Sequence, residues 1–234
     1  MGGRTVGDSD ILRAPFQRRA FGAGAFLRVV NWHNTPQARR GDLRAQLTGY
    51  LARYDPVQPD DLDRFFETGR WPLDRPGFIP AFYDGYRNNV TVAAPVCEEL
   101  GISAWFFPPT GLLDLPPQEQ RAFAAAHDVT LLDEEPHPPW WMTCDELAQV
   151  SRRHVVAAHT ATHAAAKDIR TLDDVEREIV RPVRQLTQLT GRVPPAFAFL
   201  YGTPPVPGTP AGDAVLTSGV RYAMTNTALV RVAD

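Results

Sequence analysis

The amino-acid sequence predicts a single α/β domain in which parallel strands alternate with helices. The first observation is the length of 234 residues, which suits one domain built as a barrel or a large doubly wound sheet. The second is the alternation of short apolar runs with longer stretches of helical periodicity. The third is that polar residues directly follow several of the apolar runs, where parallel α/β folds bind their ligands. A barrel and a doubly wound sheet both fit this pattern.

Composition and charge limit which binding partners and which cellular location we expect for the protein. Hydrophobic residues make up 44% of the chain, and the net charge of −3 argues against nucleic acid or an anionic membrane as the main partner. Residues 1–25 contain no apolar run, so we expect a flexible lead-in before one domain over 26–234, with neither a signal peptide nor a membrane span. We therefore expect a cytoplasmic protein, or an extracytoplasmic one if a leader has been removed. The two cysteines, Cys97 and Cys144, are expected to be free thiols.

The first half of the chain contains three predicted strands and three predicted helices. Apolar runs rich in β-branched or aromatic residues predict strands over 27–32, 78–83 and 103–107. Apolar residues at helical spacing predict helices over 42–54, 59–66 and 89–100. Pro59 opens the second helix, and Gly101 follows the third, where a left-handed terminal glycine is expected.

The second half repeats this alternation. Strands are predicted over 155–158, 196–200 and 222–225. Helices are predicted over 143–153, over 172–189 and near 212–218. Thr143 and Glu146 form a capping box at the start of the first of these helices. Prolines cluster over 108–117, 136–139 and 194–210, which predicts stiff loops there.

Three of the predicted strand ends carry polar residues, at the edge of the sheet where parallel α/β folds bind their ligands. The segments are FYDGY over 82–86, HTATH over 159–163 and FAFLYG over 197–202. His159 and His163 are four residues apart, so on a helical turn both imidazoles face the same way. Two imidazoles and one carboxylate form a metal-ligand set that leaves positions open for water and substrate. Taken alone, the histidine spacing is more often a surface accident, and Asp-Gly after a strand is also an ordinary turn.

Together these segments resemble the polysaccharide deacetylases of carbohydrate esterase family four, the NodB-homology domain. The segment over 82–86 is similar to the family's Phe-Asp-Asp-Gly-Tyr, and the segment over 159–163 to its His-Ser/Thr-x-x-His. The segment over 197–202 is similar to a third motif that usually ends in Pro-Tyr-Gly, with Leu200 in place of the proline. Two further matches are VNWH over 30–33 and the helix and strand over 94–107, so the resemblance runs from about 29 to 227. It implies a distorted (β/α)7 barrel and leaves the last strand of that barrel unaccounted for.

The resemblance also implies a metal centre. The implied ligands are Asp84, His159 and His163, and the implied metal is zinc, with cobalt, nickel or iron as alternatives. Tyr201 occupies the position whose backbone N–H helps to hold an oxyanion, with a core or rim tyrosine as the alternative.

A carbohydrate is the implied substrate or ligand. The residues expected to contact it are His33, Tyr86, Trp141 and Thr160. For the two aromatic residues, packing beneath a loop is the alternative, and for His33 it is a hydrogen-bonded place at a strand end. Thr160 has the alternative role of supporting the histidine segment.

Two departures from the family pattern concern proton transfer. Tyr83 stands where the family has its catalytic-base aspartate, and a phenol of pKa ~10 is ionised to about one part in a thousand at pH 7. The family's late Leu-x-x-His motif supplies a general acid, and no histidine follows His163 in this sequence. The first hypothesis is therefore a metal-dependent hydrolase of N-acetyl, amide or ester groups on a carbohydrate, with Tyr83 and Tyr201 as the candidate catalytic residues. The second is a degenerate homologue that binds metal and carbohydrate with little turnover, and the third is a metal-independent scaffold.

Overall fold

The strands form two sheets, the first from the N-terminal part of the described chain and the second from the C-terminal part. The computed structural model describes residues 27–225 and 229–232. The first sheet is parallel, has the order β1-β3-β4-β5 and carries a short strand on the N-terminal end of β3; its members are β1 (Leu27–Trp32), β2 (Asp55–Pro56), β3 (Gly77–Tyr83), β4 (Trp105–Phe107) and β5 (Val155–Val156). The second sheet has the order β6-β7-β8-β9, and its members are β6 (Ala158–His159), β7 (Ala196–Ala198), β8 (Tyr222–Met224) and β9 (Leu229–Arg231). Only its last pair, β8 with β9, is antiparallel among the described strands.

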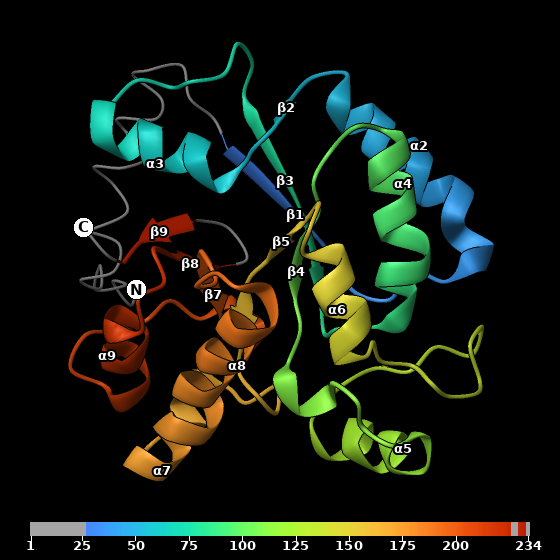
Figure 1. Cartoon of the computed structure of the whole chain (residues 1–234), viewed down its shortest axis with the longest axis vertical. Helices are drawn as coiled ribbons and strands as arrows, with labels where there is room; N and C mark the ends of the chain where they lie inside the picture. Colours follow the sequence, from blue (N-terminus) through green and yellow to red (C-terminus); the bar gives the residue numbers. More distant parts are fainter. Residues whose placement is uncertain (1–26, 226–228, 233–234) are drawn as a thin grey trace, which may run out of the picture.

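Helices cover the outer faces of these strands, with α2, α4 and α6 on one flank and α7, α8 and α9 on the other (Figure 1). The α-helices are α2 (Arg40–Leu51), α3 (Pro59–Thr68), α4 (Ala94–Glu99), α5 (Pro117–Ala126), α6 (Cys144–Val150), α7 (Leu172–Val175), α8 (Arg181–Thr190) and α9 (Pro210–Thr217). Short 3-10 turns are η1 (Gln37–Arg39), η3 (Thr110–Leu112), η4 (Ala166–Asp168) and η6 (Leu200–Gly202). Two π-helical turns, η2 (Asn89–Ala93) and η5 (Glu176–Val180), lead into α4 and α8. None of the helices in the described residues is long and apolar enough to cross a membrane.

Alternate side chains of the two sheets meet in one shared core. Ile79 and Ala81 of β3 belong to the same cluster as Ala196 of β7, together with further inward residues of β4 and β8. The opposite face of β3 presents Phe78 and Phe82 to α2 and α4. Because side chains alternate along a strand, this register turns Tyr83, at the carboxyl end of β3, inward as well. The α/β class with parallel strands is confirmed, while closure into a seven-stranded barrel stays a prediction.

Most predicted elements are present within a few residues. The predicted strand over 27–32 has the same bounds in the structure, and Thr143 caps α6 with Glu146 as expected. The predicted helices over 89–100 and 172–189 each contain a π turn, and the predicted strand over 155–158 divides at Ala157, where the chain passes between the sheets.

One α-helix and two short strands of the described residues were not predicted from the sequence. Helix α5 follows the proline-rich stretch, and its first residue is Pro117, a position where proline costs no hydrogen bond. The other two are the short strands β2 and β9. The prediction of a flexible lead-in over 1–25 lies outside the described residues. Cys97 is buried, and both cysteines are free, as predicted.

Candidate metal centre

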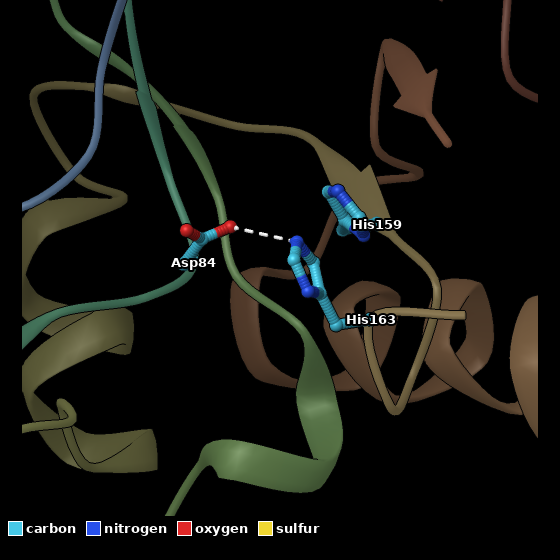
Figure 2. Close-up of side chains that lie close together, drawn as sticks. All are labelled: Asp84, His159 and His163. Atoms are coloured by element: carbon cyan, nitrogen blue, oxygen red, sulfur yellow. Dashed lines mark ion pairs between the residues drawn. The ribbon is translucent and has the colours of Figure 1, made fainter. Parts of the chain in front are cut away.

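Asp84, His159 and His163 come together in the structure as one buried cluster. Asp84 follows the last residue of β3, His159 ends β6, and His163 lies on the turn after it. Each side chain offers a ligand atom, and these atoms lie within 4.8 Å of one another (Figure 2). The three residues are 4%, 2% and 7% exposed, so the cluster is shielded from bulk solvent.

Backbone geometry at the cluster is unusual. Asp84 has a φ of 65° and His163 a φ of 61°, both in the left-handed region that residues other than glycine seldom adopt. Such conformations cost of order 1–3 kcal/mol each and concentrate at functional sites. Gly85, with a φ of 65°, continues the turn and passes close to Pro108, so the Asp-Gly pair is more than an ordinary surface turn.

Hydrogen bonds fix the orientation of the His159 ring. Its Nδ1 lies 3.1 Å from the Thr160 hydroxyl oxygen, and that hydroxyl donates its own proton to the carbonyl of Ala164 at 3.0 Å. With its proton committed, the hydroxyl can only accept, so Nδ1 of His159 carries the hydrogen and Nε2 is left as the acceptor nitrogen. Thr160 is therefore placed to support the histidine turn, the alternative role that the sequence left open for it.

The His163 ring is fixed in the same way by a different segment. Its Nδ1 lies 2.8 Å from the carbonyl oxygen of His127, a group that can only accept, so Nδ1 carries the hydrogen. In the neutral ring Nε2 is the acceptor, and it lies 3.3 Å from Oδ1 of Asp84. Outer hydrogen bonds that fix the tautomer and the ring plane are typical of metal-ligating histidines.

The electrostatics of the cluster follow from burial and from the one carboxylate. Burial lowers the pKa of His159 to about 3, with the like charge of His163 acting in the same direction, so this ring is neutral. In Asp84 and His163, burial also disfavours the charged form, but the contact between the two side chains has the larger effect. The pKa of His163 is therefore raised and the pKa of Asp84 is lowered. Asp84 is thus held as a carboxylate, the form that binds a metal.

The cluster fits a divalent transition metal. It offers two imidazole nitrogens and one carboxylate oxygen, a donor set used by catalytic zinc and related ions. Oδ1 of Asp84 is buried and makes no well-oriented hydrogen bond among the described residues, although His163 lies 3.3 Å away. A buried carboxylate oxygen without an oriented donor is costly unless a cation is its partner.

An open cavity of about 670 Å³ adjoins the cluster. Its lining includes Tyr83, His33 and Tyr201, as well as all three candidate ligands. His33 lies with Nε2 4.0 Å from Oδ2 of Asp84, so the structure places this predicted residue at the site. A second cavity of about 630 Å³ lies at the opposite ends of the strands, between Val155 and Pro195, far from this chemistry.

Tyr83 faces the cluster from the carboxyl end of β3. Its ring stacks on Phe107 with centroids 4.6 Å apart, and it is 6.2 Å from the ring of His159. Burial, together with the charge of Asp84, raises the pKa of Tyr83 above its ordinary value. The phenol therefore keeps its proton at neutral pH and can donate a hydrogen bond there.

Tyr201 lies on the rim of the cavity. It is 65% exposed, has a φ of 61°, and donates a hydrogen bond from its hydroxyl to Asp128 at 2.7 Å. The side chain thus lies at the rim of the cavity and not in the core, and the role of the Tyr201 backbone N–H in holding an oxyanion stays a prediction.

Tyr86 and Trp141 are 1% and 2% exposed and stack on each other with centroids 6.5 Å apart. The Tyr86 hydroxyl donates to the carbonyl of Thr130 at 2.5 Å. Stacking on a sugar needs an exposed ring face, so this burial favours the alternative of packing beneath a loop for Trp141. Tyr86 also borders the cavity, so its contact with a carbohydrate stays a prediction.

Several residues at the site were not identified from the sequence, and three of them make contacts that matter here. His127 orients His163, Asp128 lines the cavity, and Glu178 binds the turn between the two histidines. Each lies in a segment that is distant along the chain from the residue it contacts. No spacing signal marks them in the sequence.

No protein-family model and no curated protein sequence matches the chain. Its structure is similar to solved structures at low sequence identity. A de-N-acetylase from Aggregatibacter actinomycetemcomitans is 17% identical with a TM-score of 0.61, over 90% of this chain and 90% of that one. IcaB from Ammonifex degensii is 21% identical with a TM-score of 0.59, over 86% of this chain and 83% of that one.

BC0361, a polysaccharide deacetylase from Bacillus cereus, is 17% identical with a TM-score of 0.58 over 88% of this chain. The match spans 60% of the length of BC0361. These likenesses show that the chain has the fold of the polysaccharide deacetylases.

Proposed function

We propose that this chain, which has the fold of the polysaccharide deacetylases, hydrolyses N-acetyl or related amide or ester groups on a carbohydrate with the help of a divalent metal. One observation carries the proposal. Asp84, His159 and His163 place three ligand atoms within 4.8 Å at the carboxyl ends of strands and beside an open cavity. The motif resemblance over 82–86 and 159–163 supports the same reaction.

The ligands determine what the site can do. A divalent cation held there would supply Lewis acidity toward the acetyl carbonyl and would make a water molecule more acidic. One carboxylate and two neutral imidazoles compensate only half of a divalent charge, so the occupied site stays attractive to a carbonyl oxygen. The burial of the ligands strengthens this attraction, since charges interact more strongly in a low-dielectric environment.

The cavity suits a sugar in size and polarity. Its volume of about 670 Å³ lies within the range of ordinary small-molecule sites. Asn31, Arg39 and Asp128 on its lining offer hydrogen-bonding groups for hydroxyls. The exposed ring of Tyr201 offers an apolar face at the rim.

Proton transfer is where a second candidate function arises. Tyr83 stands where a carboxylate base is expected, and a phenol of ordinary pKa ~10 is a poor proton acceptor at neutral pH. This observation favours a chain that binds metal and carbohydrate and turns over slowly or not at all.

The experiment that separates the two candidates is acetate release from acetylated chito-oligosaccharides and xylan by zinc-loaded protein. We expect Tyr83→Asp to raise the rate by about 10²–10⁴-fold, the usual contribution of a positioned general base. Tyr83→Asn is the matched control, because it also removes the tyrosine ring that stacks on Phe107 but does not supply a base.

Each outcome of this experiment decides something. A gain in Tyr83→Asp that is absent in Tyr83→Asn supports a deacetylase limited by its base. If no variant releases acetate although each has its metal bound, the proposed hydrolysis is contradicted. The second candidate, a protein that binds metal and carbohydrate without turnover, would then be favoured. Retained activity in Tyr83→Phe would exclude a tyrosinate as the base.

A further inference from the structure

The turn between the two histidines is bound to one residue of another element. Glu178, on the π turn η5, accepts the N–H of Thr162 on Oε2 at 2.9 Å and the Thr162 hydroxyl on Oε1 at 3.0 Å. Its backbone carbonyl accepts the N–H of Ala161 at 3.2 Å. Glu178 therefore holds both residues that stand directly before His163.

Local sequence explains why the carbonyl of Glu178 is available. In an α-helix the N–H of residue i+4 binds the carbonyl of residue i, and the residue four after Glu178 is Pro182, which has no N–H. The π turn Glu176–Val180 lies at this point, as π turns often do at functional sites. The carbonyl can thus accept from outside its own helix, and Ala161 supplies the donor.

The carboxylate of Glu178 is buried and accepts three hydrogen bonds. The residue is 2% exposed, and besides Thr162 it accepts the Nε–H of Arg177 at 2.9 Å. A carboxylate is seldom buried so deeply without strong partners, because its desolvation is costly. Two of its three side-chain bonds go to the residue beside a candidate metal ligand.

We propose that Glu178 is a positioning residue that holds the turn from His159 to His163 in its metal-binding shape. This inference rests on the proposed function, since it concerns the same metal centre. The turn runs from the end of β6 to the left-handed residue His163, and both rings reach the cluster from it (Figure 2). Releasing Thr162 and Ala161 would let His163 relax from its unfavourable φ, so the two ring nitrogens would no longer be held for one ion.

Substitutions at Glu178 distinguish hydrogen bonding from charge. Glu178→Ala removes both acceptors of Thr162, and we expect zinc to bind about 10–100-fold more weakly, the usual cost of losing an outer-shell partner. In Glu178→Gln the amide oxygen can accept the Thr162 N–H while the amide nitrogen donates to the Thr162 hydroxyl. The Nε–H of Arg177 loses this acceptor, but Arg177 keeps its ion pair with Asp174, so zinc affinity should stay within about threefold of wild type. Glu176→Gln is the matched control on the same π turn, because that side chain is exposed and pairs with Arg184.

The test is calorimetric titration of zinc chloride into metal-stripped protein, with urea unfolding of each metal-free variant alongside. A merely structural role would lower the stability of Glu178→Ala and leave its zinc affinity and cobalt absorption spectrum as in wild type. The proposal predicts a weakened affinity and an altered visible spectrum of the cobalt form, both restored in Glu178→Gln.

Three results separate the possible failures. Wild-type protein that binds no zinc would contradict the proposed metal centre itself. Zinc bound equally by wild type and Glu178→Ala would overturn the positioning role and leave the metal centre intact. If Glu178→Ala does not fold, Thr162→Val decides, because it removes one side-chain bond alone: a several-fold loss of zinc affinity supports the proposal, and no loss overturns it.

Discussion

Gly111 is the residue where a single added methyl group should disturb the metal centre most selectively. Its N–H donates to the carbonyl of Ala161 at 2.8 Å, which gives the histidine turn a second anchor besides Glu178. A Cβ atom at position 111 would lie 2.7 Å from that same carbonyl oxygen. The obstacle is contact alone, since Gly111 is not among the residues with a left-handed backbone.

The size of the effect follows from this distance. Ordinary contact begins at 3.4 Å, so in Gly111→Ala the methyl group and the Ala161 carbonyl must separate by about 0.7 Å. Overpacking of this kind costs about 1–3 kcal/mol of unfolding free energy. Because site geometry has to hold within about 0.5 Å, we also expect zinc affinity to fall by about 10–100-fold.

The assay is zinc titration and urea unfolding of Gly111→Ala beside Gly49→Ala. Gly49 lies in α2 with nothing within 4 Å of an added Cβ, so its replacement should leave zinc affinity unchanged and stabilise the helix by up to about 1 kcal/mol. Wild-type zinc affinity in a folded Gly111→Ala protein would refute the reasoning that the turn's position governs the site.

Other predictions concern the core, the pH dependence and the thiols. Leu186 is fully buried in α8, so Leu186→Ala should lower the unfolding free energy by about 2–5 kcal/mol in urea. Burial lowers the pKa of His154, whose Nδ1 accepts the N–H of Ala104. The folded protein therefore binds a proton at His154 more weakly than the unfolded chain does. The free energy of unfolding should be highest above pH 6.5 and should fall below that pH by at most about 1.4 kcal/mol per pH unit. His154→Asn keeps an acceptor without titrating and should show a shallower loss; equal slopes would contradict this. Burial raises the pKa of Cys97 to about 12, so a thiol reagent at pH 8 should label it only after unfolding.

The sequence was most informative where local pattern alone decides the structure. The strand Leu27–Trp32 is a short run rich in apolar and β-branched residues, and the α6 capping box depends on residues three apart. The clustering of Asp84, His159 and His163 was predictable because these residues lie in two short segments at strand ends. Helix α5 was missed because prolines at its start resemble a loop, although Pro117 suits a first helical turn.

The remaining site residues depend on contacts that no local pattern encodes. Glu178 reaches Thr162 across 16 residues, and the carbonyl of His127 reaches His163 across 36. The burial of Trp141 is likewise decided by packing against Tyr86, so an aromatic residue beside a motif could not be assigned to a sugar from sequence. Pro182 removes the α-helical donor of the Glu178 carbonyl, but the contact of that carbonyl with Ala161 is evident only in the folded structure.

The central claim is that Asp84, His159 and His163 form a metal centre, and the metal content of purified protein tests it most directly. After incubation with zinc and removal of the excess, elemental analysis should find about one zinc per wild-type chain. The same analysis should find little in Asp84→Asn or His163→Ala, since each variant keeps only two ligands. Equal zinc in wild type and both variants, with the variants folded, would contradict the ligand assignment.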